Sequence, residues 1–313
     1  MLVKYSVMGL FSSVRIVGTE LSKLCTPQHL RCLHTGCASL AADKAQLMKL
    51  RKSTGYTFIN CKAALERFNN DITQAENWLN EQAQKEGWSK ANKLEGRRAK
   101  EGLVGLLMQD SSAVMVEVNC ETDFVAKNEK FQQLVKDVAL ATMEHHHSKA
   151  KGQGGYMKST LQAEDLAKLS VSGGSSLADQ MALYIGRLGE NMSVRRAVCL
   201  SVPSDWRIGS YVHGGAAAAL MGVAMGKYSA LVVFQDGASS GSETLGRKLA
   251  QHVVGEAPVS LGNMDDLPTG QSETRLLQQA LLWDSSLTVA QFLRQQNAKV
   301  MDFARFQCGE GSE

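Results

Sequence analysis

The sequence lacks any apolar run that approaches the roughly eighteen residues needed by a membrane-spanning helix, so we predict no membrane association. It also lacks cysteines in paired spacing, which excludes the usual zinc and thioredoxin-like motifs. Three of the seven cysteines fall in residues 1–42, and the other four are Cys61, Cys120, Cys199 and Cys308. We expect these four to be reduced, partly buried thiols, and Cys120 is the one whose reactivity is of interest.

A phosphate-binding loop ending in Gly-Lys-Ser/Thr is also missing. Residues 241–248 have its glycine spacing, but Arg247 stands in place of the lysine and no hydroxyl follows. The adjacent histidines at 145–147 cannot share one helical face, which favours a polar loop over a metal site. These absences predict a protein that acts by binding a partner, with no covalent chemistry, no cofactor and no metal. We therefore expect no enzymatic active site.

The formal net charge of +3 is concentrated at the start of the chain. Residues 1–42 hold four basic side chains and the single acid Glu20, so the remainder is close to neutral and gives no support to nucleic-acid binding. A basic, acid-poor start with a short apolar helical face predicts a mitochondrial transit peptide over residues 1–45, and hence the mitochondrial matrix. A secretory signal is the alternative, but Lys23 and Arg31, beyond the apolar stretch, favour mitochondria.

Residues 46–84 have the periodicity of a small helical domain. Leu47 and Leu50 lie on one face of a first helix that residues 54–55 end, and a second helix follows. Residues 71–74 resemble a capping box that opens a third helix. Three short helices around so small a core predict a ubiquitin-associated-like (UBA-like) fold.

The rest of the sequence predicts a linker followed by an α+β core. Residues 85–101 form a charged connector, which is either a solvated helix or linker, or a basic strip that touches RNA or a partner. The core then divides into two related subdomains, residues 102–200 and 201–313, each built from an antiparallel sheet plus helices.

Two strand–strand–helix patterns support this division. A first hairpin is expected over residues 102–118, and a second over residues 218–234. Helices are expected between them at residues 161–169 and 177–188. The tail, residues 287–306, predicts a helix followed by a strand.

The most informative turn joins a strand to a helix within the first pattern. Residues 114–118 alternate as a half-buried strand does, and residues 131–138 have apolar side chains three and four apart, as in a helix that buries one face. Between them, Thr122 and Asp123 are N-cap candidates. Phe124 is then either an ordinary core residue near a capped helix start or a ring displayed for binding. The second pattern has no counterpart of this turn.

Several blocks, in order along the chain, resemble the translation elongation factor Ts family. The strongest is residues 117–126, Glu-Val-Asn-Cys-Glu-Thr-Asp-Phe-Val-Ala. The others are residues 50–55, 61–65, 189–196, 211–215, 288–293 and 305–311. With the predicted transit peptide, the resemblance is to the mitochondrial type.

The resemblance implies a guanine nucleotide exchange factor for the GTPase mitochondrial elongation factor Tu, which would release GDP so that GTP can bind. It implies a UBA-like N-terminal domain that docks on the partner, and an exchange wedge at the strand-to-helix turn. The residues carried over are Thr122, Asp123, Phe124 and Val125 for the wedge, Leu50, Arg51 and Thr54 for the N-terminal domain, and Tyr211, His213 and Gly214 for the second subdomain.

One departure from the family bears on stoichiometry. Bacterial members carry a helical hairpin insertion in the second subdomain, whereas residues 258–281 here are short and turn-rich. A one-to-one heterodimer with the GTPase is therefore expected. The alternatives left open are an RNA-binding accessory factor, suggested by the basic connector, and a ubiquitin-binding adaptor, suggested by the helical domain alone.

Overall fold

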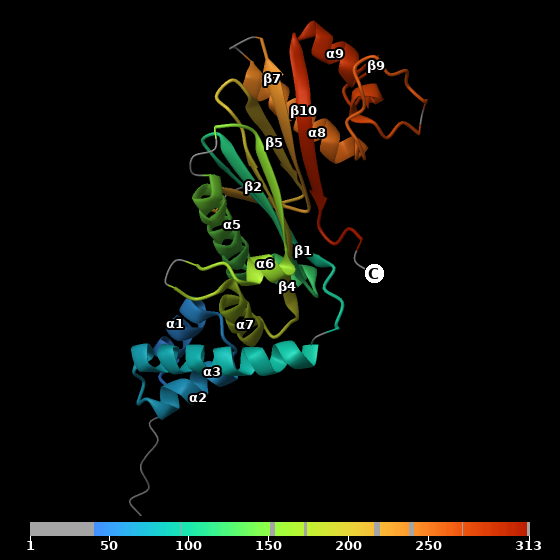
Figure 1. Ribbon diagram of the computed structural model, residues 1–313. Coiled ribbons are helices and arrows are strands. Elements are labelled where there is room, and N and C mark those ends of the chain that lie inside the picture. The colour runs from blue at the N-terminus through green and yellow to red at the C-terminus, as the bar shows by residue number, and fades with distance from the viewer. Residues whose placement is uncertain are drawn as a thin grey trace, which may run out of the picture. The chain divides into compact units, whose positions relative to one another are not determined.

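The computed structural model describes residues 41–94, 96–150, 154–171, 174–215, 220–237, 241–270 and 272–311. The predicted transit peptide therefore lies outside the described residues, except for its last five positions. Helices and antiparallel sheets together build the chain, with a helical N-terminal domain ahead of a mixed core (Figure 1). The predicted α+β class is thus confirmed. None of the helices in these ranges has the length and apolar character needed to cross a membrane.

Three helices form the N-terminal domain: α1 (Lys44–Thr54), α2 (Phe58–Arg67) and α3 (Ile72–Leu94). The Asp43 side chain caps α1, and Gly55, with a φ of 78°, ends it in the left-handed conformation that glycine adopts without strain. Buried side chains from all three helices, and Tyr56 between α1 and α2, meet in one cluster. The helical members are Leu47, Leu50, Cys61, Ala64, Leu65, Ala75, Leu79 and Ala83. The three predicted helices are confirmed, whereas the likeness to a ubiquitin-associated fold stays a prediction.

Helix α3 runs to Leu94, well into the residues predicted as a connector. Its second half packs along α7 (Leu177–Leu188) (Figure 1). A Cβ on Gly87 would lie 1.7 Å from the Ala182 carbonyl oxygen, and one on Gly186 would lie 2.2 Å from the Ala83 carbonyl oxygen. Both glycines are therefore needed for the two helix backbones to approach so closely.

The first sheet has five strands in the order β3-β4-β2-β1-β6, and every neighbouring pair is antiparallel. The strands are β1 (Glu101–Gln109), β2 (Ser112–Cys120), β3 (Met157–Gln162), β4 (Met192–Ser201) and β6 (Val223–Gly226). Strands β1 and β2 form the hairpin predicted over residues 102–118, which is confirmed.

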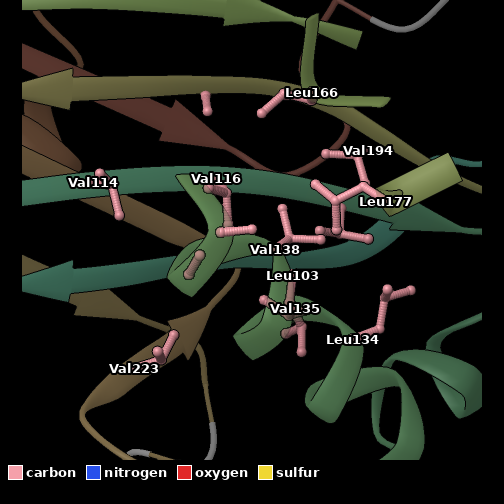
Figure 2. Close-up of a cluster of buried hydrophobic side chains, with 14 of the residues drawn as sticks. Leu103, Val114, Val116, Leu134, Val135, Val138, Leu166, Leu177, Val194 and Val223 are labelled. Carbon is pink, nitrogen blue, oxygen red and sulfur yellow. The ribbon is translucent and has the colours of Figure 1, made fainter. Parts of the chain in front are cut away.

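Helix α5 (Glu129–Ala150) covers one face of this sheet. Its predicted apolar stripe is confirmed, because Phe131, Leu134, Val135 and Val138 are all fully buried. Figure 2 shows side chains of α5 gathered with Leu103, Val116 and other strand residues in one apolar cluster. Each such side chain stabilises the fold by roughly 1.5–3 kcal/mol relative to an exposed position. Two short helices, α4 (Asp123–Ala126) and α6 (Ala163–Ala167), complete this layer.

The second sheet has the order β10-β7-β5 and is likewise antiparallel. Its strands are β5 (Arg207–His213), β7 (Tyr228–Asp236) and β10 (Ala298–Gln307), with α8 (Ser242–Glu256) against β5 and β7. A turn η1 (Leu276–Gln278), strands β8 (Ala280–Leu281) and β9 (Asp284–Thr288), and α9 (Val289–Gln295) lead into β10. The predicted tail helix and strand are confirmed by α9 and β10.

Strand β2 is buried along its whole length, so the prediction of a half-buried strand is wrong. One set of its side chains, including Val114 and Val116, faces the α5 layer. The other set, including Ala113 and Met115, joins a cluster that also contains Leu231 and Val233 of the second sheet. The alternation in the sequence cannot show this, because it depends on a distant strand that covers the second face.

Two further expectations are wrong. The hairpin predicted over residues 218–234 does not form: β6 pairs with β1, and β7 pairs with β5 and β10. The helix predicted over residues 161–169 is limited to α6, because Leu161 lies on β3, which extends the first sheet beside β4. In both places a long-range strand pairing overrides the local pattern. Helix α7 matches its prediction.

A buried carboxylate joins the two halves of the core. Glu117, in β2, has no exposed surface, and its Oε2 accepts from Arg196 Nε at 2.6 Å. Its Oε1 accepts from Arg195 Nη1 at 3.2 Å and from the backbone N–H of Gly309, just after β10, at 2.8 Å. The Arg196 guanidinium also lies 4.3 Å from the centre of the Phe306 ring. The end of the second sheet is thereby tied to the middle of the first.

We predict that Glu117→Gln lowers the free energy of unfolding by about 3 kcal/mol, because it leaves buried donors without their charged acceptor. The matched control is Glu66→Gln, which removes a carboxylate from the exposed Lys62–Glu66 pair at 3.7 Å and is expected to change stability by about 0.5 kcal/mol or less. Urea unfolding of both variants measures the difference. Equal losses would show that the buried network contributes no more than a surface pair.

Candidate functional site

The turn after β2, residues 122–125, is named here the Phe124 turn. Thr122 is the N-cap of α4, and its hydroxyl accepts from the Val125 backbone N–H at 3.3 Å. This confirms Thr122 as the capping residue. The cap satisfies a donor that the first turn of a helix cannot pair internally. The turn is therefore a formed element, and the direction of the next side chain is set by helical backbone geometry.

Phe124 is 80% exposed, so the hypothesis that it is an ordinary core residue is wrong. Phe131, seven positions further on, is fully buried. The two rings belong to neighbouring helices, yet only one contributes to the core. Val125 is partly buried and packs against the α5 cluster, which holds the turn down beside the exposed ring. An exposed aromatic ring on a capped turn is available for contact with a partner, and aromatic side chains are enriched in protein interfaces.

Asp123 forms an ion pair with Lys127, with 2.7 Å between Oδ2 and Nζ. This hydrogen bond with Lys127 lowers the pKa of Asp123 below its ordinary value. The same contact raises the pKa of Lys127. Both groups are exposed and stay charged at neutral pH, so the residue before Phe124 carries an ionised carboxylate that is paired with Lys127.

A second turn, residues 189–191, braces the first and is named here the Glu190 turn. Glu190 Oε1 accepts from the Thr122 hydroxyl at 2.7 Å, and Oε2 accepts from the Thr122 backbone N–H at 3.0 Å. In return, Glu121 Oε1 accepts from the backbone N–H of Asn191 at 2.8 Å. Glu190 and Asn191 belong to the block at residues 189–196, but their role was missed, because nothing local to either turn shows that the two meet.

Cys120 is fully buried at the end of β2, and its thiol lies 3.2 Å from the Thr122 carbonyl oxygen. Burial raises the pKa of this thiol to about 12, and the Glu190 carboxylate acts in the same direction. The thiolate, which is the reactive form, is therefore scarce at neutral pH. Cys120 contributes to packing and is a poor nucleophile.

The three residues carried over to the N-terminal domain occupy different environments. Leu50 has no exposed surface and Thr54 is 2% exposed, with its hydroxyl donating to the Leu50 carbonyl at 2.6 Å. Of these three residues, only Arg51 is exposed. Lys130, in the first turn of α5, donates from Nζ to the Ser53 carbonyl at 2.7 Å and joins this end of α1 to the segment that follows the Phe124 turn.

Tyr211, His213 and Gly214 lie at the end of β5, where the Tyr211 hydroxyl and His213 Nδ1 are 3.3 Å apart. Lys227 connects them to the first sheet. Its backbone N–H donates to the His213 carbonyl at 2.8 Å, and its Nζ pairs with Glu101, the register partner of Cys120. Lys130 thus joins α1 to α5, and Lys227 joins the end of β5 to β1; the sequence had indicated neither contact.

The described ranges contain no cluster of three or more His, Cys, Asp or Glu side chains able to hold a metal ion. The histidines at 145–147 lie on α5 and not in a loop, and His146 is buried with Nε2 2.6 Å from the Ser201 hydroxyl. Burial lowers the pKa of His146, so this ring serves the core as a neutral group.

Comparison with known proteins agrees with this geometry. The family model described as elongation factor TS matches residues 121–269, a range that begins one residue before the Phe124 turn and includes the Glu190 turn. A second model, described as elongation factor Ts, mitochondrial, N-terminal, matches residues 30–89. These two matches indicate that the fold and the turn are those of the elongation factor Ts class of proteins.

Individual relatives show which type of elongation factor Ts the chain resembles. Elongation factor Ts, mitochondrial, of Salmo salar is 69% identical over 303 residues, which cover 97% of this chain and 98% of the relative. The protein of the same name from Rattus norvegicus is 52% identical over 287 residues, covering 90% and 89%. That from Homo sapiens is 48% identical over 300 residues, covering 95% and 92%. The chain belongs to the mitochondrial elongation factor Ts family.

The exposure of the two phenylalanines gives a direct prediction. Phe124→Ala is expected to change the free energy of unfolding by no more than about 0.5 kcal/mol, because the ring contributes little to the core. Phe131→Ala is expected to cost about 3–5 kcal/mol, since it leaves a cavity between α5 and the first sheet. Chemical denaturation of the two variants tests this, and a large loss for Phe124→Ala would contradict the exposed position.

Proposed function

We propose that this protein is a guanine nucleotide exchange factor for mitochondrial elongation factor Tu, acting in the mitochondrial matrix. It promotes GDP release from that GTPase so that GTP can load during translation elongation. Membership of the mitochondrial elongation factor Ts family supports the proposal. The single observation that carries the site is Phe124, 80% exposed on a capped and braced turn. The activity needs no covalent chemistry and no cofactor of this chain.

Exchange by such a protein rests on differential affinity. The factor binds the nucleotide-free GTPase more tightly than the GDP-bound form. By thermodynamic linkage, bound GDP lowers the affinity of the GTPase for the factor by the same ratio by which the factor lowers its affinity for GDP. Phe124 would insert its ring between helices of the GTP-binding domain. Asp123 would compete for contacts that hold the magnesium and phosphate region in place. Loss of the Mg²⁺ contacts removes a large part of the affinity for the phosphates.

Two further surfaces would give the complex its affinity. Arg51, at the exposed side of α1, would dock the N-terminal domain. Tyr211, His213 and Gly214 would face the second half of the partner. Because Lys130 and Lys227 tie both surfaces to the strands and helices around the Phe124 turn, all three would engage one partner together.

A one-to-one heterodimer is the proposed assembly. Between α8 and β8, the described residues hold only the short turn η1, so the helical hairpin of bacterial members has no counterpart there. We keep the proposed division into residues 46–84, 85–101, 102–200 and 201–313 as the functional parts of the chain. In this division, the strand β6 of the last part completes the sheet of the third.

The decisive experiment is release of a fluorescent GDP analogue from mitochondrial elongation factor Tu. The full chain is expected to accelerate release strongly, and Phe124→Ala to lower the rate at a limiting factor concentration about 30-fold, which corresponds to the loss of an aromatic anchor of about 2 kcal/mol. Asp123→Ala is expected to reduce the rate in the same direction.

A matched control is Leu267→Ala, which also truncates an exposed apolar side chain (84% exposed) but outside the three surfaces described here. It is expected to leave the rate unchanged. Acceleration that survives both turn variants would move the site to the wider interface. If the parent protein does not accelerate release at all, the exchange function is wrong, and RNA binding or ubiquitin binding would have to be measured instead.

A further inference from the structure

The Phe124 turn has no hydrophobic core of its own. Helix α4 contains four residues, of which only Ala126 is fully buried. An element this short is not stable alone, since one helical turn fixes several dihedral angles for very few hydrogen bonds. Something outside the turn must therefore hold the exposed ring in one orientation.

Glu190 is the group placed to do so. Its two carboxylate oxygens accept from the two donors of Thr122, the hydroxyl at 2.7 Å and the backbone N–H at 3.0 Å. Because an ionised carboxylate only accepts, the Thr122 hydroxyl must direct its hydrogen to Glu190. Its lone pairs are then free to accept from the Val125 N–H and to cap α4. The position of the Glu190 carboxylate therefore determines how Thr122 caps α4, the helix that carries Phe124.

Glu190 is itself fixed by the end of a longer helix. Gly189, with a φ of 77°, ends α7, and its N–H donates to the Ile185 carbonyl at 2.9 Å. The backbone N–H of Asn191, the residue after Glu190, donates to Glu121, and the Asn191 side chain donates to the Arg97 carbonyl at 2.9 Å. The two segments therefore hold each other. Glu190 accepts from the Thr122 backbone N–H, and Glu121, just before the Phe124 turn, accepts from the Asn191 backbone N–H.

We infer that Glu190 is a positioning residue for nucleotide exchange: through Thr122 it holds the Phe124 turn in the geometry that enters the partner. The inference rests on the proposed function. Glu190 itself need not touch the partner, because its carboxylate is occupied by Thr122. Its loss should thus reduce the step that follows docking more than docking itself, which uses the other surfaces.

The test variant is Glu190→Gln, which keeps the shape but offers one acceptor oxygen and an NH₂ group to two donors. The full chain and its variants are titrated against mitochondrial elongation factor Tu loaded with a fluorescent GDP analogue. We expect the maximal release rate to fall about tenfold, as for the loss of a charge-assisted hydrogen bond, and the half-saturating concentration to change by no more than about twofold.

Companion variants separate positioning from general damage. Thr122→Val keeps the backbone N–H but loses the hydroxyl, and it should behave as Glu190→Gln does. In the double variant Glu190→Gln/Phe124→Ala, the Glu190 change should lower the rate by less than it does in the parent chain, because the brace acts largely through that ring. Glu164→Gln, an exposed carboxamide control on α6, should be silent.

Amide hydrogen exchange of the free chain tests the brace without the partner. Protection of the Val125, Ala126 and Lys127 N–H groups should fall in Glu190→Gln, while protection of the buried half of α5 stays unchanged. An unchanged release rate, or unchanged protection of these amides, would overturn the inference. A raised half-saturating concentration at an unchanged maximal rate would also overturn it, since Glu190 would then be a contact residue. Failure of the parent chain to release GDP would instead overturn the proposed function.

Discussion

The buried carboxylate of Glu117 is the contact on which the arrangement of the core depends. It lies in the middle of a strand with apolar side chains on both faces, where an unpaired charge would be strongly destabilising. Arg195 and Arg196 of the neighbouring strand satisfy it from within the first sheet. The N–H of Gly309 satisfies it from the tail that leaves the second sheet. Because donors from both sides converge on this one carboxylate, Glu117 ties the first sheet to the tail of the second, at the point where a register shift interrupts the pairing of β2 with β4.

The same strand that carries Glu117 ends at the Phe124 turn. Because β2 is anchored at Glu117, its end holds Cys120 and Thr122 beside the Glu190 turn. From there, Phe131 lies inside the core and Phe124 lies outside it. One ring stabilises the platform, and the other is the ring for which we propose a contact with the partner. Lys130 and Lys227 extend this platform to the N-terminal domain and to the end of β5.

Much of the fold follows from local pattern. The stripe that begins at Phe131 predicts α5, alternation predicts the first hairpin, and Thr122 is recognisable as a cap, because each depends on residues within a few positions of one another. The errors share one cause. Strand β6 pairs with β1 and not with β7, and β3 forms where the start of the helix over residues 161–169 was expected. Both result from pairing between segments far apart in the chain, which no window of sequence contains.

The candidate site divides along the same line. Residue order alone was sufficient for the family, for the capped turn, and for the chemistry of a carboxylate beside an aromatic ring, since these are properties of adjacent residues. Three-dimensional packing decided that Phe124 points into water and that Leu50 and Thr54 do not. It also decided that Glu190 meets Thr122 across 68 positions. Burial and hydrogen-bond pairing between distant segments depend on how the whole chain closes its cores.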